Sequence, residues 1–443
     1  MSNEHVICLL NDSFPPFIDG VSNTVLNYAR VINENHGKSL VVTPSVSGVK
    51  DNYPFPVVRF TSIDTRKRLG YVTGYPFSPE AAKAVGKSGT QLLHAHCPFA
   101  TALLGRELAG AFNLPLIMTW HTKYDVDIAK AVKFRILKAG ALKALMSNVN
   151  ACDEVWTVSK GAGENLKSLG YEGNYIVMPN GVDLPRARVD EAVVKETVGS
   201  YDLPQDTPCY LFIGRMMWYK GIKIILDALA MHKKSGADFR MVFVGSGADF
   251  EEIKKYSEEA GIADKTIFTG PIRNREALRA WYQRADLFLF PSTYDTNGLV
   301  VREAAASDTA AILVEGSCAA EDVTDGRNGF FIKENADSLA AKLAELSKNP
   351  ERVKEVGVNA GNEIYISWED AVARACDRYD IVIDKFRRGD YGIRDPLKGS
   401  WMQSQGELMQ IVGQFRDINR SLRTNIIGGM KDKVVNVLSR DDE

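Results

Sequence analysis

The stretch 290–303, Phe-Pro-Ser-Thr-Tyr-Asp-Thr-Asn-Gly-Leu-Val-Val-Arg-Glu, has the pattern of an anion-binding turn. An apolar strand pattern ends at Pro291, and after a polar turn a helical pattern begins at about Leu299. N–H groups at a helix N-terminus lack intrahelical acceptors, and the helix dipole favours negative charge there. The turn is therefore predicted to bind a phosphate group through the backbone of Asn297, Gly298, Leu299 and Val300.

Two carboxylates flank this turn, Asp295 before it and Glu303 on the helix, eight positions apart. One carboxylate on each side is suited to binding two sets of hydroxyl groups with a diphosphate between them. The alternative interpretation of such a pair is a helix N-cap and a surface acid.

A cationic pair and a glycine turn give two weaker signals. Arg215 and Lys220 follow a predicted strand, five positions apart, and a guanidinium fork beside an ammonium suits two neighbouring phosphates. Gly20 and Val21 follow the first predicted strand, where a glycine allows the backbone to approach a ligand closely. The simpler interpretations are solvated side chains for the cations and an ordinary β-to-α turn for the glycine.

Short apolar segments that alternate with helical patterns must position these residues. Strands that are apolar on both faces and alternate with helices predict mostly parallel sheets covered on both sides. In the first part of the chain we expect strands at 6–10, 40–43, 57–60, 91–94, 116–119 and 155–158, and helices at 21–32 and 100–111. In the second part we expect strands at 209–213, 241–244, 266–268, 287–290 and 311–314, and helices at 222–233, 251–259 and 275–284.

The sequence therefore predicts an α/β protein with two tandem doubly wound, Rossmann-like domains and a boundary within 184–204. A chain of 443 residues is longer than the ~250–300 residues that one core usually serves. Ligands bind open α/β sheets at the carboxyl ends of their strands, so we expect a binding cleft between the two domains.

Composition excludes several classes of function. A formal net charge of −2 gives no global attraction to nucleic acid, and none is expected as a partner. The six cysteines show no C-x-x-C pair and no metal-ligand spacing with histidine. No signal-peptide pattern and no apolar run of about 20 residues is present, so a cytoplasmic protein is expected, with contact at the inner face of a membrane left open.

Taken together, the motifs resemble glycosyltransferase family 4, whose members have the GT-B fold and retain anomeric configuration. The similarity extends from about Val6 to Ile383 and is specific only in combination. The matching motifs are Pro16 to Ser22, His94-Ala-His96, Thr119-Trp-His121-Thr, Val158-Ser-Lys160, Pro179-Asn-Gly-Val-Asp183, Gly214-Arg215 with Lys220-Gly221, Val244-Gly-Ser-Gly247 and Ser367-Trp368-Glu369. Asp295 departs from the family, which has glutamate at that position.

The resemblance implies a role for each candidate residue on the donor. Glu303 would bind the ribose hydroxyls, Arg215 and Lys220 the diphosphate, and the backbone of Asn297 to Val300 the phosphate and the sugar. These interactions would stabilise the leaving diphosphate without a metal or another cofactor.

Other residues would contact the sugar and the base. The resemblance implies that Asp295 binds hydroxyls of the transferred sugar and that His121 reaches this sugar near the reacting centre. The peptide at Ile272 would read the base edge, and Gly20 and Val21 would lie over the phosphates. Arg215, Lys220, Asp295 and His121 are thus the expected catalytic set.

The resemblance also divides the chain into 1–186 (acceptor side), 187–365 (donor side), 366–386 (a helix crossing back to the first domain) and 387–443 (a helical extension). The expected reaction transfers a hexose from a UDP-glucose-like or GDP-mannose-like donor to a lipid or glycan. Residues His96 to Phe99 and Thr119 to Tyr124 look most like enzymes that glycosylate diacylglycerol.

Two segments bear on partners. Basic residues between 130 and 143 would attract anionic lipid, although their spread around a helix equally fits a solvated surface. In the extension, apolar residues from 408 to 426 are spaced by three and four and form one narrow stripe on a predicted helix. The stripe either packs on the chain itself or binds a second copy, a protein partner or a membrane.

Two other functions stay open on the same architecture. One is a sugar-nucleotide epimerase, which donor alone would reveal by releasing epimerised sugar. The other is a non-catalytic scaffold that binds sugar nucleotides, which the shorter Asp295 and the extension favour. A phosphorylase is less suited, because no lysine has a recognisable pyridoxal-binding context.

Overall fold

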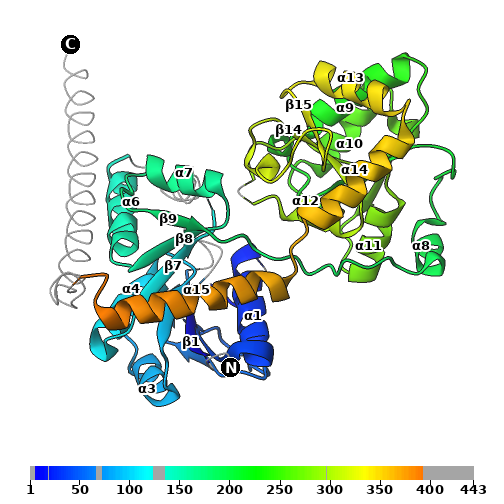
Figure 1. Ribbon diagram of the computed structural model, residues 1–443. Coiled ribbons are helices and arrows are strands. Elements are labelled where there is room, and N and C mark those ends of the chain that lie inside the picture. The colour runs from blue at the N-terminus through cyan, green and yellow to red at the C-terminus, as the bar shows by residue number, and fades with distance from the viewer. Residues whose placement is uncertain (1–4, 18, 66–71, 123–134, 296, 393–443) are drawn as a thin grey trace, which may run out of the picture. The chain divides into compact units, whose positions relative to one another are not determined.

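The computed structural model describes residues 5–17, 19–65, 72–122, 135–295 and 297–392. The chain divides into two compact units, each with its own parallel sheet (Figure 1). The first unit comprises residues 1–155, 166–175 and 379–443, and the second comprises 156–165 and 176–378. The predicted pair of doubly wound α/β domains is confirmed.

The first sheet has seven strands in the order β3-β2-β1-β6-β7-β8-β9. These strands are β1 (His5–Leu10), β2 (Gly37–Pro44), β3 (Val57–Phe60), β6 (Leu92–Ala95), β7 (Leu116–Trp120), β8 (Glu154–Thr157) and β9 (Tyr175–Val177). The accompanying helices are α1 (Gly20–Val31), α3 (Pro79–Ser88), α4 (Ala100–Phe112), α6 (Arg135–Asn150) and α7 (Lys160–Ser168). A separate two-stranded sheet pairs β4 (Ser62–Ile63) antiparallel with β5 (Thr73–Gly74). The strand order reverses between β1 and β6, which pair in parallel.

The second sheet has six strands in the order β12-β11-β10-β13-β14-β15. They are β10 (Cys209–Ile213), β11 (Arg240–Val244), β12 (Thr266–Gly270), β13 (Leu287–Phe290), β14 (Ala310–Val314) and β15 (Phe330–Ile332). The helices are α8 (Glu191–Val198), α9 (Ile222–Lys234), α10 (Phe250–Glu259), α11 (Arg275–Arg284), α12 (Leu299–Ala306), α13 (Ala336–Leu346) and α14 (Pro350–Glu363), followed by α15 (Trp368–Arg388). Here the order reverses between β10 and β13.

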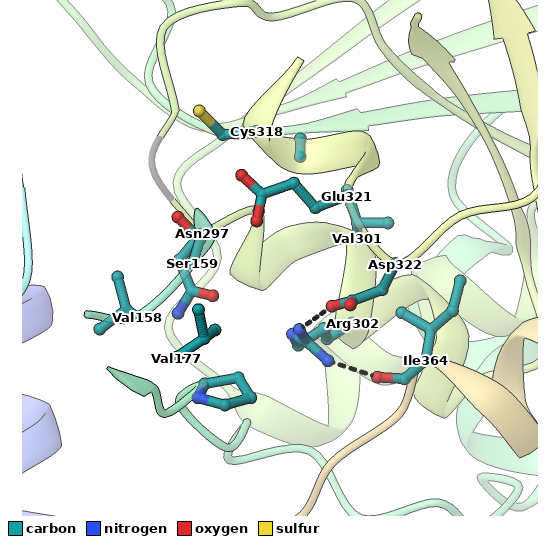
Figure 2. A pocket seen from close by; sticks show the side chains of 13 residues that line it. Val158, Ser159, Val177, Asn297, Val301, Arg302, Cys318, Glu321, Asp322 and Ile364 are labelled. Carbon is teal, nitrogen blue, oxygen red and sulfur yellow. Dashed lines mark hydrogen bonds and ion pairs between the residues drawn. The ribbon is translucent and has the colours of Figure 1, made fainter. Parts of the chain in front are cut away.

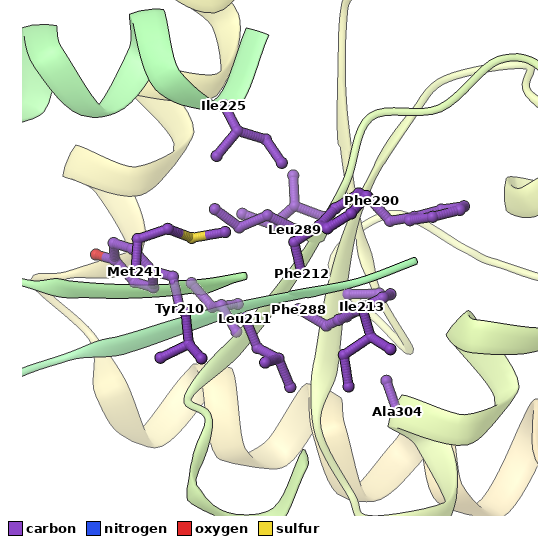
Figure 3. Close-up of a cluster of buried hydrophobic side chains, with 14 of the residues drawn as sticks. Tyr210, Leu211, Phe212, Ile213, Ile225, Met241, Phe288, Leu289, Phe290 and Ala304 are labelled. Carbon is purple, nitrogen blue, oxygen red and sulfur yellow. The ribbon is translucent and has the colours of Figure 1, made fainter. Parts of the chain in front are cut away.

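Apolar strands make the core that fixes these strand ends. Every residue of β10 and β13 is buried, and Phe212 stacks on Phe290 with ring centroids 6.0 Å apart (Figure 3). Figure 3 also shows Ile225 of α9 and Ala304 of α12 beside these strands. Each large apolar side chain buried in this way contributes about 1.5–3 kcal/mol. The core therefore holds the carboxyl ends of β10 and β13 next to each other.

The predicted division at 186/187 differs from the observed units. Residues 156–165 and 176–186 belong with the second unit. Their contacts explain this: Glu321 accepts hydrogen bonds from the backbone of Lys160 and Gly161, and Asp183 accepts one from the indole of Trp368. The first-unit residues of α15 begin at Tyr379.

Two predicted features lie outside the described residues. The apolar stripe at 408–426 falls in the undescribed segment 393–443, as does most of the predicted extension. The basic segment at 130–143 is described only from Arg135 onward.

Candidate functional site

The reversal of strand order between β10 and β13 brings the two predicted phosphate-binding loops together. The loop 214–221 follows β10, and the loop 291–298 follows β13, its neighbour in the sheet. Open α/β sheets bind ligands at such reversals, outside the carboxyl ends of the strands. The cationic loop and the carboxylate-bearing loop thus occupy one edge of the second sheet.

Gly221 makes a close approach between these loops possible. Its φ of +77° is left-handed, and a Cβ atom there would overlap the carbonyl oxygen of Pro291. Beside it, the Lys220 Nζ lies 2.5 Å from Oδ1 of Asp295, whose Oδ2 accepts a hydrogen bond of 2.6 Å from Ser292. Two residues predicted independently, 75 positions apart, therefore form one partly buried ion pair.

Arg215 stands on a rigid loop but has an exposed side chain. A Cβ at Gly245 would overlap the carbonyl oxygen of Gly214, and a Cβ at Gly247 would overlap that of Met216. The loop after β11 is thereby pressed against the loop that carries Arg215. Within the part of the chain that the structure describes, the guanidinium of Arg215 has no ion pair or hydrogen bond, so its five donors face solvent.

The helix after this turn begins at Leu299, as predicted. Gly298 caps it with φ +56° and no side-chain hydrogen bond, and Ala319 packs where a Cβ would stand. Among the described residues, the backbone N–H groups of Leu299 and Val300 have no acceptor. An uncapped helix N-terminus beside an ion pair and a free guanidinium has the chemistry of an anion site.

Glu303 lies one turn into α12 and is held by Tyr282. The phenol donates a hydrogen bond of 2.9 Å to Oε2 of Glu303. Burial raises the pKa of Glu303 to about 7, against the opposing effects of the Tyr282 hydrogen bond and the charge of Arg275. A carboxyl with this pKa changes charge near neutral pH, so its capacity to accept hydrogen bonds from hydroxyl groups depends on pH.

Ile272, whose peptide is predicted to contact the nucleotide base, follows β12 and is partly buried against the core of the second unit. It therefore lies at the same sheet edge as the other predicted donor residues. Its contact with a base stays a prediction.

A pocket in the second unit adjoins this turn. Asn297 and Gly298 line it, and Figure 2 shows Val301 and Arg302 on one side and Ser159 with Val177 on another. The empty space, open to solvent, is about 410 Å³. Both polar side-chain atoms of Asn297 are buried and have no partner among the described residues.

Charged side chains in this pocket were not predicted from the sequence. Arg302 donates to Asp322 and to the carbonyl oxygen of Ile364, and these bonds are drawn in Figure 2. Glu321 accepts from the N–H groups of Lys160 and Gly161 at 2.6 and 2.5 Å. Glu321 and its partners lie more than 150 positions apart in the sequence. No local motif predicts these pairings.

His121, the candidate residue of the first unit, follows β7 and lies in a stack of imidazoles. Its Nε2 is 3.0 Å from Nδ1 of His96, and the His94 and His96 ring centroids are 3.9 Å apart. Burial lowers the pKa of His121 to about 3 and holds the pKa of His96 well below its usual range. All these rings are therefore neutral at physiological pH.

Gly20 and Val21 form the first turn of α1, where the sequence predicted a close backbone approach. Asp19 caps this helix and accepts hydrogen bonds of 2.9 and 2.8 Å from the N–H groups of Val21 and Ser22. A Cβ at Gly20 would meet no atom within 4 Å. The Val21 N–H group is thus already occupied, whereas the glycine leaves open space beside its backbone.

Across the described ranges, no group of three or more His, Cys, Asp or Glu side chains is arranged to hold a metal ion. No helix within those ranges is both long and apolar enough to cross a bilayer. Metal independence stays a prediction.

Comparisons with known proteins agree with this architecture. The family described as Glycosyltransferase Family 4 matches residues 18–186, and Glycosyl transferases group 1 matches residues 194–363. The alpha-monoglucosyldiacylglycerol synthase of Acholeplasma laidlawii is 24% identical over 391 residues, covering 86% of this chain and 98% of its own length. The enzyme of the same name from Streptococcus pneumoniae is 23% identical over 383 residues, covering 83% and 86%.

A solved structure shares the fold. The crystal structure of Anabaena Alr3699/HepE in complex with UDP superposes with a TM-score of 0.67 at 18% identity, covering 85% of this chain and 99% of that one. The two matched families lie side by side along the chain and correspond to its two parallel sheets. The chain therefore belongs to the family 4 glycosyltransferases of the GT-B fold.

Proposed function

We propose that this glycosyltransferase moves a hexose from a nucleoside diphosphate sugar to a lipid acceptor, with retention of anomeric configuration and without a metal. The observation that carries the proposal is the edge between β10 and β13. There Lys220, the guanidinium of Arg215 and the N-terminus of α12 bring positive charge to one sheet edge, and the last two have no side-chain partner among the described residues. A diphosphate is the common donor group that matches this arrangement.

The charge arrangement supports a mechanism based on leaving-group stabilisation. Cleavage of the bond between the anomeric carbon and the diphosphate oxygen leaves negative charge on the diphosphate. Fixed cations and N–H groups stabilise that charge without reorganisation, which lowers the barrier. The acceptor hydroxyl then bonds to the anomeric carbon on the same face, and its proton passes to the leaving phosphate oxygen. No side chain has to form a covalent intermediate.

The remaining donor contacts follow from position and charge. Glu303 accepts hydrogen bonds from the two ribose hydroxyls, and Asp295 accepts them from hydroxyls of the transferred hexose. The Lys220 ammonium has three N–H donors, so it bonds a phosphate while keeping Asp295. His121, whose imidazole is neutral, is proposed to contact the hexose as the family resemblance implies.

Two observations favour a lipid acceptor over a soluble glycan. Two similar proteins bear the name alpha-monoglucosyldiacylglycerol synthase, and their matches cover 83–86% of this chain. The sequence motifs at His96 to Phe99 and beginning at Thr119 are also most similar to diacylglycerol glycosyltransferases. The proposed donor is UDP-glucose-like, with a GDP-mannose-like donor as the alternative to be tested.

The test is a transfer assay with a panel of sugar nucleotides and vesicles that contain diacylglycerol. The expected result is a glycolipid formed from one donor, whose anomeric proton shows the configuration of the donor. Free epimerised sugar would support an epimerase, and donor binding without turnover would support a scaffold; either result contradicts the proposal.

Excess EDTA tests the metal-free part of the mechanism. Activity is expected to persist after chelation, because Arg215, Lys220 and the helix N-terminus supply the positive charge. Complete loss of activity that manganese or magnesium restores would overturn this part. Magnesium added to an unchelated sample is the control for ionic-strength effects.

A further inference from the structure

The carboxylate of Glu303 is bonded to the protein through one of its two oxygens. The phenol of Tyr282 on α11 donates a hydrogen bond of 2.9 Å to Oε2, which is shorter than its 3.4 Å contact with the carbonyl oxygen of Val300. Among the described residues, Oε1 has no hydrogen-bond partner, and the side chain of Glu303 is only partly buried. One oxygen is therefore held by the fold, while the other stays open to a ligand.

Tyr282 is fixed in place independently of Glu303. Its side chain is fully buried, and its ring packs against Phe288 of β13 with centroids 5.6 Å apart. Its carbonyl oxygen accepts a hydrogen bond of 2.7 Å from the hydroxyl of Thr309. Burial and the neighbouring charge of Glu303 raise the pKa of Tyr282 well above its usual value, so the phenol keeps its proton and remains a donor.

Charged groups near Glu303 have opposing effects. Arg275 on α11 and Asp183, in the segment before α8, form an ion pair of 2.6 Å, so their opposite effects on the pKa of Glu303 partly cancel. On α12 itself, Arg302 is engaged by Asp322. The elements β13, β14 and α14, which pack against α12, contribute buried apolar side chains to this contact. The hydrogen bond from the phenol is thus the strongest influence that favours the ionised form of Glu303.

Burial by itself favours the neutral form of a carboxyl group, and the neutral form is a poor acceptor for two hydroxyl groups. It carries a proton on one oxygen, which leaves fewer lone pairs for hydroxyl donors. A hydrogen bond that is made to the charged form opposes this effect of burial. The phenol of Tyr282 supplies such a bond at Oε2 of Glu303 and leaves Oε1 uncovered.

We propose that Tyr282 is a positioning residue of the donor site, because it holds Glu303 in its ionised form with Oε1 free to bind the ribose hydroxyls. This inference rests on the proposed function, in which Glu303 binds the nucleotide. Tyr282 acts through Glu303 and does not itself touch the donor, since its side chain is fully buried. Recognition of the ribose therefore depends on a phenol that lies behind the carboxylate.

The first test measures the affinity for UDP-glucose against pH in Tyr282→Phe, which keeps the buried ring and removes the hydroxyl. UDP-glucose is a suitable probe because each of its phosphates has only one, strongly acidic proton and does not change charge near neutral pH. Loss of the bond raises the pKa of Glu303 above the wild-type value of about 7, so the pH at which half the affinity is lost should rise by about one unit.

This shift predicts an effect that disappears at high pH. The carboxylate is present above its pKa and is lost as the pH falls through it. Tyr282→Phe should therefore bind about five- to tenfold more weakly than the wild type between about pH 6 and pH 7, and within about twofold of it at about pH 9. An unchanged midpoint would overturn the proposal. An equal loss of affinity at every pH would give Tyr282 a purely structural role, which also overturns it.

Thr309→Val is the matched control. It removes the buried hydrogen bond to the carbonyl oxygen of Tyr282 and leaves the phenol in place. It should lower the melting temperature and leave the pH midpoint unchanged, and a shifted midpoint would show that loosening this contact is sufficient. In a Glu303→Gln background, Tyr282→Phe should cause no further loss of affinity at any pH. A further loss there would show that Tyr282 acts by a route other than Glu303.

A measurement on the wild-type protein does not depend on the folding of Tyr282→Phe. ¹³C NMR of the full chain with labelled tyrosine follows the Cζ atom of each phenol against pH. The signal of Tyr282 should change with a midpoint at about 7, the pKa of Glu303, and this change should disappear in Glu303→Gln. It reports the bond, because burial keeps the phenol itself protonated. A spectrum without such a signal would contradict the proposal.

Failure of the proposed function is distinguishable from failure of this inference. If Glu303→Gln binds UDP-glucose as tightly as the wild type at every pH, the contact between Glu303 and the ribose is refuted. The tyrosine spectrum of the wild type still decides whether Tyr282 holds Glu303 in its ionised form.

Discussion

The second sheet repeats the order of the first six strands of the first sheet, and the two differ in the electrostatics of the edge where the strand order reverses. In the first unit, neutral and buried imidazoles follow β6 and β7. In the second, the loops after β10 and β13 carry an ion pair and an exposed guanidinium. The helices after β1 and β13 differ in the same sense, because Asp19 caps α1, whereas no side chain of the described residues caps α12.

The difference shows that the residues just beyond the strands, and not the fold, decide what each edge can bind. A negative side chain at the start of α1 occupies the N–H groups that a phosphate would use. The same positions of α12 are open to an anion. The second unit is thus suited to a charged donor, whereas the first is suited to neutral hydrogen bonds with hydroxyl groups.

The largest effect is expected from removing positive charge at the second edge. Lys220→Ala should lower kcat by about 10²–10³-fold, because a fixed donor to the leaving group is lost where charge develops in the transition state. Lys223→Ala is the control, since it removes an exposed lysine that pairs with Asp227 on α9. Equal turnover numbers in both variants would show that the positive charge of Lys220 does not give the second sheet edge its proposed role.

A smaller loss is expected from Glu303→Gln, measured by titration with the nucleotide. Loss of a charged acceptor should weaken nucleotide binding by about 1.5–3 kcal/mol. Because burial raises the pKa of Glu303 to about 7, the carboxylate is present above that pH and is protonated below it. Wild-type affinity should therefore fall as pH drops below 7, and the variant should lose this dependence.

The exposed Glu276→Gln provides the control for that titration. It should keep the wild-type affinity at every pH. A wild-type affinity that is constant from pH 5 to 8 would contradict the assignment of Glu303 to the ribose hydroxyls.

Matched glycine substitutions compare the rigidity of the two edges. Gly221→Ala should lower the free energy of unfolding by about 1–3 kcal/mol, because alanine is strained at φ +77° and overlaps the Pro291 carbonyl. Gly20→Ala should leave it nearly unchanged, since a Cβ there meets no atom within 4 Å. Thermal unfolding of both variants is the measurement, and similar melting temperatures would refute the comparison.

The smallest effect is expected at Asp295. Asp295→Glu keeps the charge and adds one methylene, so its pairing with Lys220 should persist with a change in kcat/KM of under about tenfold, or ~1.4 kcal/mol. Asp295→Asn removes the charge and should cost more. Competition among the sugar nucleotides of the panel shows whether the shorter side chain sets the sugar preference. An unchanged ranking of donors by activity in Asp295→Glu would argue against that role.

The sequence predicted the fold well because its strands carry a strong local signal. Apolar runs such as 209–213 and 287–290 match β10 and β13 at both ends, and the turn before Leu299 identified α12. The domain division at 186/187 stays a prediction: the family matches end at 186 and begin again at 194, whereas the assignment of the preceding segments to a compact unit depends on contacts between distant parts of the chain. Residues 156–165 and 176–186 belong to the second unit through Glu321 and Trp368.

Within the candidate site, residue identity was predictable and pairing was not. Motifs singled out Lys220 and Asp295 separately, but only the order of the strands makes them neighbours. The raised pKa of Glu303 and the bond between His96 and His121 both arise from burial, which a motif does not report. The pairing of Glu321 with the start of α7 likewise has no local signature.

That pairing distinguishes α7 from α12, although residues at the N-termini of both helices line the same pocket. Glu321 accepts from the first two N–H groups of α7, and Ser159 accepts from the next two through its hydroxyl and carbonyl oxygens. The protein thus supplies its own anion to the N-terminus of α7, whereas the N–H groups of Leu299 and Val300 in α12 have no acceptor among the described residues. If the proposed function is correct, a diphosphate meets open N–H donors at α12 and donors already bonded to Glu321 and Ser159 at α7, so the contacts of α7 direct the anion to α12.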